Sequence, residues 1–113
     1  MLYVEAQDLF KELRAARADD SHKRRMARLT AVQLLIIDDL GLRPLQGEEP
    51  MDLYDIIRLR YERAATVITS NRDTGELAHL FADELLASAA MDRLLHDAHI
   101  LRLTGDTYRN PRK

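Results

Sequence analysis

The sequence of 113 residues predicts an α/β fold, with a parallel β-sheet in a three-layer arrangement. Short β-prone runs alternate with longer segments of helical periodicity, which is the pattern of βαβ units. One of the short runs, residues 34–37, is apolar at every position rather than at alternate positions. Continuous apolarity is typical of a strand covered on both faces, so we expect helices on both sides of the sheet.

The first half of the chain contributes two strands, two helices and a long loop to this prediction. Residues 2–4 are β-prone, and the apolar residues over 6–17 recur at helical spacing, which predicts an amphipathic helix. We expect Ser21 to cap the N-terminus of a second, shorter helix. The apolar strand at 34–37 is followed by residues 41–50, whose prolines and glycines predict a loop.

The second half of the chain continues the alternation of helices and strands. Helical spacing predicts a helix over 51–64, and the β-branched residues over 66–70 predict the next strand. Two further helices are expected over 76–82 and 84–98, before a last strand at 100–103. No internal repeat or low-complexity segment interrupts this order, so residues 1–113 are expected to form one domain.

The composition excludes several classes of protein. Apolar residues make up 46% of the chain and charged residues 32%, an ordinary balance for a soluble globular domain. The net charge of −2 indicates no bulk attraction to nucleic acid or membrane, and the absence of cysteine excludes disulfide bonds and cysteine metal sites. The longest unbroken apolar run is far too short to span a bilayer. We therefore expect a cytoplasmic protein with no membrane partner.

Two acids, Asp38 and Asp39, follow the apolar strand and are the first candidates for a functional role. Ligands of open α/β sheets bind at the carboxyl edge of the strands, where these carboxylates are expected to lie. In phosphoryl transfer one such acid holds Mg²⁺, directly or through water, and a second polar group orients the attacking water. An acid also suits a simple turn, so the pair alone leaves both interpretations open.

Asn71 and Arg93 are the next candidates. Asn71 follows the strand at 66–70, so its amide could hold a water and a γ-phosphate oxygen at the same edge, or it could simply support a turn. Arg93, on the last predicted helix, could be an arginine finger for a neighbouring subunit, a role that contributes on the order of 10³–10⁵ in rate. The alternative is a surface ion pair with Asp92 or Asp97, which would contribute little.

A run of basic residues lies on the second predicted helix, with no acid among them. It consists of Lys23, Arg24, Arg25 and Arg28. These side chains could contact DNA phosphates, each adding about one unit to the dependence of binding on salt. They could equally form a solvated helix face, and no aromatic residue interleaves with them to stack on bases.

Several segments together resemble one protein family. They are Glu12-Leu13-Arg14-Ala15-Ala16-Arg17, Asp38-Asp39-Leu40-Gly41, Arg60-Tyr61-Glu62-Arg63, Thr69-Ser70-Asn71-Arg72, Asp92-Arg93-Leu94-Leu95-His96 and Gly105-Asp106-Thr107-Tyr108-Arg109. In this order and spacing they resemble the AAA+ ATPases of the IstB type, which are transposition helper proteins of insertion sequences and relatives of the DnaC helicase loaders. The resemblance covers nearly the whole chain. It depends on the match of all these segments together and not on any single one.

The resemblance implies a role for each candidate residue. Asp38 would be the acid on the magnesium side, acting through water, and Asp39, in the Walker B position, would polarise the attacking water. Asn71 would be the sensor residue at the nucleotide, and Arg93 would be the trans-acting arginine finger. Intact members of the family are expected to use ATP and Mg²⁺, to bind DNA with little sequence preference, to form oligomers and to engage a transposase.

One part of the family pattern does not occur in these residues. The family has a G-x-x-x-x-G-K-[ST] phosphate loop upstream of the matched region, whereas here no glycine precedes a lysine. We therefore expect these residues to be the C-terminal part of an AAA+ core, without its first strand and phosphate loop. We expect that this part does not hydrolyse ATP alone. That strand would lie between those at 66–70 and 100–103, which are then expected either to pair directly or to leave a gap.

Three functions follow from this resemblance. The chain could be a truncated ATP-binding helper protein of transposition, or a non-catalytic module that docks onto full-length AAA+ subunits. It could also be a fragment of a DnaC-like helicase loader, although the segments at 92–96 and 105–109 favour the IstB type.

Overall fold

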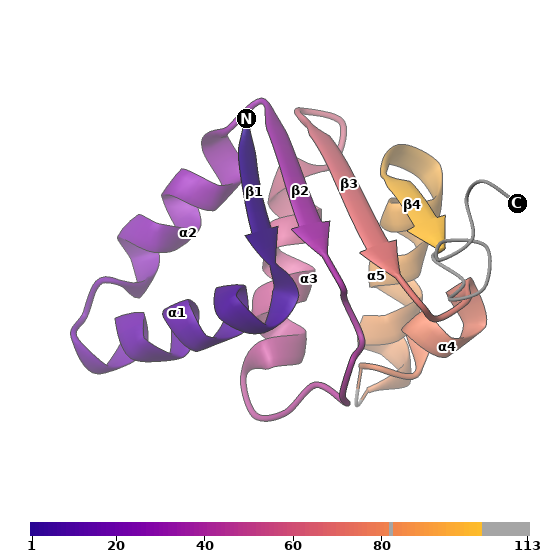
Figure 1. The fold of residues 1–113 in the computed structure, drawn as a ribbon, viewed down its shortest axis with the longest axis horizontal. Helices are drawn as coiled ribbons and strands as arrows, with labels where there is room; N and C mark the ends of the chain where they lie inside the picture. The colour runs from indigo at the N-terminus through magenta and orange to yellow at the C-terminus, as the bar shows by residue number, and fades with distance from the viewer. Residues whose placement is uncertain (82, 103–113) are drawn as a thin grey trace, which may run out of the picture.

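Four parallel strands form a single sheet, in which the spatial order of the strands is the order in the chain (Figure 1). The structure is a computed structural model that describes residues 1–81 and 83–102. The predicted α/β class and the parallel sheet are both confirmed. The strands are β1 (Leu2–Glu5), β2 (Leu34–Asp38), β3 (Ala65–Ser70) and β4 (His99–Arg102).

Helices connect each strand to the next, as the alternation in the sequence predicts. Two helices connect β1 to β2, one connects β2 to β3, and two connect β3 to β4. Their bounds differ from the predicted ones by a few residues at most. The helices are α1 (Ala6–Ala18), α2 (His22–Ala31), α3 (Glu49–Arg60), α4 (Thr74–Ala78) and α5 (Glu84–Asp97).

Two details at helix ends differ from the sequence prediction. Ser21 stands at the N-cap of α2, but its hydroxyl donates to a carboxylate oxygen of Asp19 instead of accepting from the helix. The helix α3 ends at Arg60 instead of continuing to residue 64, because Glu62 has a positive φ of 58°. Residues 82 and 103 of the predicted elements, and the segment 105–109, lie outside the described residues.

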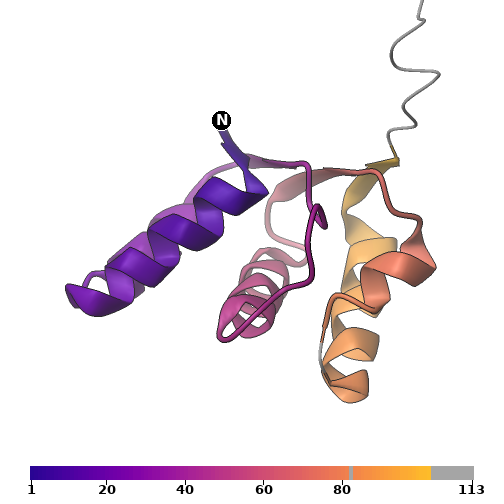
Figure 2. The same ribbon diagram turned by 60° about the horizontal axis from the view of Figure 1, so that its bottom comes forward.

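The helices of the described residues all lie on one side of the sheet, as Figure 2 shows. This follows from the strand order: each crossover steps in the same direction across the sheet, and right-handed crossovers in one direction all pass over one face. On β2, Leu35 and Ile37 are fully buried against the helices, whereas Ile36 between them is partly exposed. Of the three predicted layers, the described residues therefore form two.

β4 pairs directly with β3, in parallel and in register from Val67 opposite His99 to Ser70 opposite Arg102. Of the two alternatives that the sequence leaves open at this place, the structure has direct pairing and no gap. The strands therefore end together at one edge of the sheet, which we call the carboxyl edge. The opposite edge, where the strands begin, is called the amino edge.

The core lies between the sheet and the helices. It is formed by apolar residues of every helix and of the buried face of the strands, with Leu9, Leu35, Leu53, Ile56 and Ile68 fully buried. In the part of the chain that the structure describes, no helix is long and apolar enough to cross a membrane.

Arg60 is the largest fully buried side chain, and it ties the amino edge together. Its guanidinium donates to the hydroxyl of Thr66 at 2.8 Å and to the carbonyl oxygens of Leu29 and Val32 at 3.0 and 2.7 Å. A fourth bond goes to the carbonyl of Ala65. Burial lowers the pKa of Arg60, yet the many oxygen acceptors keep its charge solvated within the protein.

Candidate functional site

The structure places Asp38 and Asp39 at the carboxyl edge of the sheet, as the sequence predicts. Asp38 is the last residue of β2, and Asp39 follows it with a positive φ of 59°. Aspartate tolerates this left-handed conformation better than most residues, and the conformation turns the chain sharply away from the strand. The chain therefore leaves the direction of the strand directly after Asp38.

The last residues of β3 are hydrogen-bonded to the end of β2 and to the two residues that follow it. The Thr69 hydroxyl donates to the Asp38 carboxylate and accepts the backbone N–H of Asp39 at 2.9 Å. The carbonyl of Thr69 accepts the N–H of Leu40 at 2.9 Å, and the Ser70 hydroxyl donates to the carbonyl of Leu40 at 2.6 Å. These bonds fix the backbone that carries the acid pair.

Gly41 and Arg72 extend this contact by one more residue on each side. The Nε of Arg72 donates to the carbonyl of Gly41 at 2.6 Å, and the Arg72 side chain lies against the glycine. A Cβ on Gly41 would meet that side chain at 2.8 Å, and its φ of 91° is one that other residues rarely adopt. The close approach of the two segments therefore depends on this glycine.

The Asp38 carboxylate is held by two hydroxyl groups. Thr69 donates to one of its oxygens, and the Tyr3 hydroxyl from β1 donates to the other at 2.5 Å. The bond from Thr69, followed by that from Tyr3, holds the pKa of Asp38 below its usual value, because both bonds favour the charged form. The same contact with Asp38 raises the pKa of Tyr3 to about 12. Asp38 is therefore a fixed, ionised carboxylate at neutral pH.

Asn71 lies at the same edge as the acid pair, directly after β3, and is exposed. Asp39 is half-buried. Among residues 1–81 and 83–102, no side-chain hydrogen bond is formed by the Asp39 carboxylate or the Asn71 amide. The edge thus combines a fixed backbone with two polar side chains that form no hydrogen bond with the described residues, which suits an exchangeable ligand.

Arg93 lies far from these residues, toward the amino edge. It is in the last turns of α5, which runs back to the start of β4 (Figure 1). Its guanidinium carbon is 5.9 Å from the ring centre of Tyr54 and 5.7 Å from that of Tyr61, within the range of cation–π contacts. Its Nη1 donates to the carbonyl of Ala89, and no ion pair forms with Asp92 or Asp97 in the described structure.

The basic run on α2 is only partly a free surface. Lys23, Arg24 and Arg28 are exposed, as an interface with phosphates would require. Arg25 is half-buried, and its guanidinium forms an ion pair with Glu12 of α1 at 3.0 Å. The structure therefore leaves three of the four basic residues open to a ligand.

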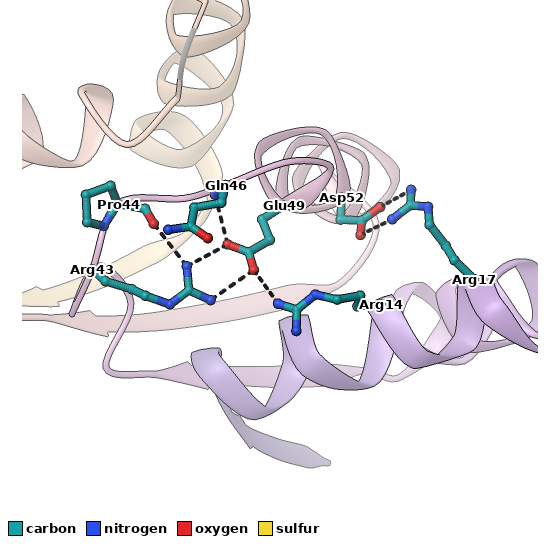
Figure 3. Close-up of polar contacts among 7 residues, drawn as sticks. All are labelled: Arg14, Arg17, Arg43, Pro44, Gln46, Glu49 and Asp52. Carbon is teal, nitrogen blue, oxygen red and sulfur yellow. Dashed lines mark hydrogen bonds and ion pairs between the residues drawn. The ribbon is translucent and has the colours of Figure 1, made fainter.

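An ionic cluster between α1 and α3, shown in Figure 3, was not predicted from the sequence. Glu49 accepts from Arg14 at 2.9 Å and from both terminal nitrogens of Arg43 at 3.0 and 2.9 Å. Asp52, which is buried, accepts two bonds of 2.8 Å from Arg17. With Glu48, whose carboxylate lies 3.8 Å from Arg17, three acids face three arginines, so the cluster stabilises the packing of α1 against the loop and α3.

A signal for this cluster was present in the sequence. Arg14 and Arg17 are three residues apart, as are Glu49 and Asp52, and this spacing places each pair on one face of its helix. The spacing does not say which two helices meet, because both pairs could equally face solvent. Only the packing of α1 on α3 decides that the two faces meet.

The fold defines the class of this protein. The structure is similar to the crystal structure of DnaI, with a TM-score of 0.75 and 25% sequence identity, over 90% of this chain and 56% of that one. The similarity to DnaI identifies this parallel α/β sheet, with acids at its carboxyl edge, as an AAA+-type fold.

The sequence comparisons identify the family within this class. The family model described as IstB-like ATP binding protein matches residues 1–113. An insertion-sequence ATP-binding protein of Sinorhizobium fredii, y4uH, is 38% identical over 113 residues, which are 100% of this chain and 46% of that protein. The ATP-binding protein of insertion sequence IS232 from Bacillus thuringiensis is 32% identical over 95% of this chain and 43% of its own length. This chain belongs to the IstB-like ATP-binding protein family.

The chain spans less than half the length of these curated relatives. The activity of a whole family member therefore involves residues beyond those matched here.

Proposed function

We propose that this chain supplies the magnesium-side and water-orienting half of an ATPase site in a transposition helper protein. The observation that supports this proposal is the set of hydrogen bonds that joins Thr69–Arg72 to Asp38–Gly41 at the carboxyl edge. A turn alone needs no such set of bonds between two strands. A site that must hold an acid pair and an amide in a fixed relation at the ligand-binding edge does need it.

The chemistry of the edge suits Mg²⁺ held through water. The described residues contain no group of three or more histidine, cysteine or acidic side chains that could hold a metal ion. Mg²⁺ keeps several water ligands and uses one or two carboxylates together with substrate phosphates, so Asp38 would hold it through a water molecule. When bound, the ion would neutralise charge on the phosphates.

The protein side chains have separate roles in this proposal. Asp38 stays ionised because Thr69 and Tyr3 donate to it, and it would hold Mg²⁺ through water when the ion is bound. Asp39 accepts a proton or hydrogen bond from the attacking water. Asn71, a neutral amide, contacts a phosphate oxygen without adding negative charge.

A polypeptide of these residues alone is proposed not to turn over ATP. Two carboxylates without a phosphate-binding loop repel a triphosphate, because neither the backbone N–H cradle nor its lysine is present in the sequence. The cradle must come from another segment before the acid pair can act.

Arg93 and the basic helix extend the proposal to partners. Arg93 lies away from the acid pair of its own chain, so it would reach the nucleotide of a neighbouring subunit in an oligomer. Lys23, Arg24 and Arg28 would contact DNA phosphates without reading the sequence, and the assembly would engage a transposase.

A second candidate function is a non-catalytic module that docks onto full-length AAA+ subunits. It is supported by Leu95 on α5, a large apolar side chain that is 61% exposed. A helicase-loader fragment is the third candidate, supported by the similarity to DnaI.

The proposal is tested by titrating a fluorescent ATP analogue into the purified chain with Mg²⁺. We expect no saturable binding at micromolar concentration by a chain that is folded by circular dichroism. In a full-length relative, replacing the residues matching Asp38 or Asp39 with asparagine should abolish hydrolysis. Micromolar binding by the isolated chain would contradict the requirement for an added cradle, and full hydrolysis by both variants would contradict the roles of the acids.

A further inference from the structure

A cavity of about 570 Å³ lies at the ionic cluster, between α1, residues 43–48 and the first turn of α3. Three arginines line it, Arg14 and Arg17 from α1 and Arg43 from the loop (Figure 3). Neither acid of the pair at the carboxyl edge lines this cavity. Its volume is in the range of small-molecule sites. We call it the arginine cavity.

Two buried acids of the cluster fix the guanidinium groups. Glu49 accepts hydrogen bonds from Arg14 and Arg43, and Asp52 accepts two from Arg17. The side chains of Glu49 and Asp52 are only 7% and 3% exposed. These acids therefore hold the arginines in place while presenting little of their own charge to the cavity, as the supporting residues of a preorganised site do.

The arginines keep hydrogen-bond donors that the cluster does not use. Each guanidinium has five N–H groups. Within the described residues Arg14 donates one hydrogen bond and Arg17 two, and their side chains are 63% and 35% exposed. Arg14 and Arg17 are three residues apart, so they lie on the same face of α1. The cavity thus offers an anion two neighbouring guanidinium groups with free donors.

The start of α3 adds to the positive potential of the cavity, and one acid opposes it. No side chain caps the N-terminus of α3, which carries partial positive charge. The opposing acid is Glu48, whose side chain is 69% exposed and whose carboxylate is 3.8 Å from Arg17, too far for a hydrogen bond. Glu48 is therefore loosely held, and an anion that displaces it would take its place beside Arg17.

A phosphate monoester matches these donors better than a carboxylate does. Guanidinium forks bind both kinds of anion through paired hydrogen bonds. A phosphate monoester presents three acceptor oxygens and more than one negative charge, so it can accept from Arg14 and Arg17 together. A carboxylate has two oxygens and a single charge, and one guanidinium already satisfies it.

We infer that the arginine cavity binds a phosphate monoester, held by Arg14 and Arg17. The monoester belongs either to a free molecule such as a nucleotide or to the 5′-phosphate of a nucleic-acid strand. This inference goes beyond the proposed function and does not depend on it, because the acid pair and Asn71 take no part in the binding.

The test is a titration of the ¹⁵N-labelled chain with adenosine 5′-monophosphate, followed by NMR. EDTA in the buffer excludes any contribution of Mg²⁺ at the acid pair, and sodium chloride keeps the ionic strength constant. We expect saturable shifts of the arginine Nε–H signals and of the backbone N–H of Gly47, which lines the cavity. The dissociation constant should be on the order of 1 mM.

Three variants locate the binding. Arg14→Gln removes a fork and should weaken binding at least about tenfold. Glu48→Gln removes the opposing charge and should strengthen binding about threefold. Arg58→Gln is the matched control, because Arg58 is an exposed arginine that pairs only with Asp55 in the described structure and does not line the cavity. It should change the affinity by less than about twofold. The spectrum of each variant shows whether the chain is folded.

Two oligonucleotides distinguish the sources of the phosphate. They are one short single strand with a 5′-phosphate and the same strand with a 5′-hydroxyl, which has only diester phosphates. Tighter binding of the phosphorylated strand than of the free nucleotide, with the same loss in Arg14→Gln, supports the site and assigns it to strand ends. Tighter binding of the nucleotide supports the site and assigns it to a free molecule.

Four results would overturn the inference. The first is a folded chain whose cavity signals do not shift up to about 20 mM nucleotide. The second is equal affinity of the wild type and Arg14→Gln. The third is equal affinity for acetate, and the fourth is equal affinity for the two oligonucleotides with no binding of the nucleotide, which would indicate attraction to the backbone alone.

Discussion

The two edges of the sheet are built in opposite ways. At the amino edge, the buried Arg60 uses its guanidinium to bond four oxygens of α2, β3 and the segment between α2 and β2. At the carboxyl edge the bonds between the two segments come largely from backbone groups and from Thr69 and Ser70. There Asn71 is exposed and Asp39 half-buried, and neither side chain forms a hydrogen bond in the described structure.

This difference separates stability from ligand binding. Arg60 is buried and uses four of its five N–H donors within the protein, so it stabilises the fold and is not accessible to a ligand. At the carboxyl edge, the fixed backbone positions the side chains of Asp39 and Asn71. Their functional groups are not used in hydrogen bonds of the described structure and stay available to a ligand. The helix α3 links the two edges, with Glu49 in the ionic cluster at one end and Arg60 at the other.

The largest effect is expected at the amino edge, from Arg60→Met. The change leaves the carbonyls of Leu29 and Val32 buried without their donor, so the free energy of unfolding should fall by about 3–5 kcal/mol. Arg58→Met, on the same helix but exposed, should change it by less than about 0.5 kcal/mol. Urea denaturation measures the free energy of unfolding of both variants. Equal losses would show that Arg60 does not hold the amino edge together.

The next effect is expected at the other end of α3, from Asp52→Asn. Loss of the charge weakens the paired bonds from Arg17 at a buried site, and we expect a loss of about 2 kcal/mol. Asp55→Asn on the same helix breaks only an exposed pair with Arg58 and should cost less than about 1 kcal/mol. Urea denaturation of the two variants side by side decides whether burial sets the difference.

Two threonines on β3 sharpen the comparison between the edges. Thr66 accepts from Arg60 at the amino edge, and Thr69 donates to Asp38 at the carboxyl edge. Each change to valine should cost about 1 kcal/mol. Only Thr69→Val should raise the pKa of Asp38, because it removes the bond that lowers that pKa most. Titration of the carboxyl carbons by NMR distinguishes them, and an equal shift in both variants would contradict this assignment.

The charge of Asp38 should appear in the pH dependence of stability. Its pKa is lowered in the folded state, so the stabilisation is present above the ordinary aspartate pKa of about 3.9 and is lost as pH falls through the lowered value. The difference in unfolding free energy between the wild type and Asp38→Asn should therefore shrink on acidification. A difference that is constant with pH would contradict the lowered pKa of Asp38.

Tyr3 gives a second measure of the same contact, at the alkaline end. Its pKa is raised to about 12, chiefly by donating to Asp38, so this contribution to stability is present below the ordinary pKa and is lost as pH rises through the raised one. In Asp38→Asn the Tyr3 pKa should return toward about 10. Ultraviolet absorbance of the phenolate follows it, with Tyr3→Phe identifying the signal.

The smallest effects on stability are expected at the open side chains of the carboxyl edge. Asp39→Asn and Asn71→Ala should each change the free energy of unfolding by less than about 0.5 kcal/mol, since neither side chain is bonded in the described structure. Asparagine also tolerates the positive φ at position 39. A loss above about 1 kcal/mol at either position would show that the carboxyl edge, too, is built for stability.

Local sequence patterns predicted the elements well because the signals are local. The helical spacing in 6–17 and the β-branched run at 66–70 each correspond to an element of the structure. The position of Ser21 at a helix start was also predicted, but the partner of its hydroxyl was not, because Asp19 competes for it. The continuous apolar run at 34–37 did not reveal that the described helices cover only one of its faces.

The placement of the candidate site was partly predictable. Acids after one strand and an amide after the next must meet if the strands are parallel neighbours, and the pairing of β2 with β3 meets that condition. The bonds from Thr69 and Tyr3 to Asp38 could not be predicted, because they depend on the strand register. The stacking of Arg93 on Tyr54 and Tyr61 likewise depends on how α5 packs on α3.

The sequence by itself determined the α/β class, the order of strands and helices, and the family. Periodicity and motifs are local features that involve residues close together in the chain. The tertiary structure decided which groups meet across it: Arg14 and Arg43 at Glu49, and the side of the sheet on which the helices lie. These contacts join residues distant in the chain, and their partners are chosen by packing and by the handedness of the crossovers.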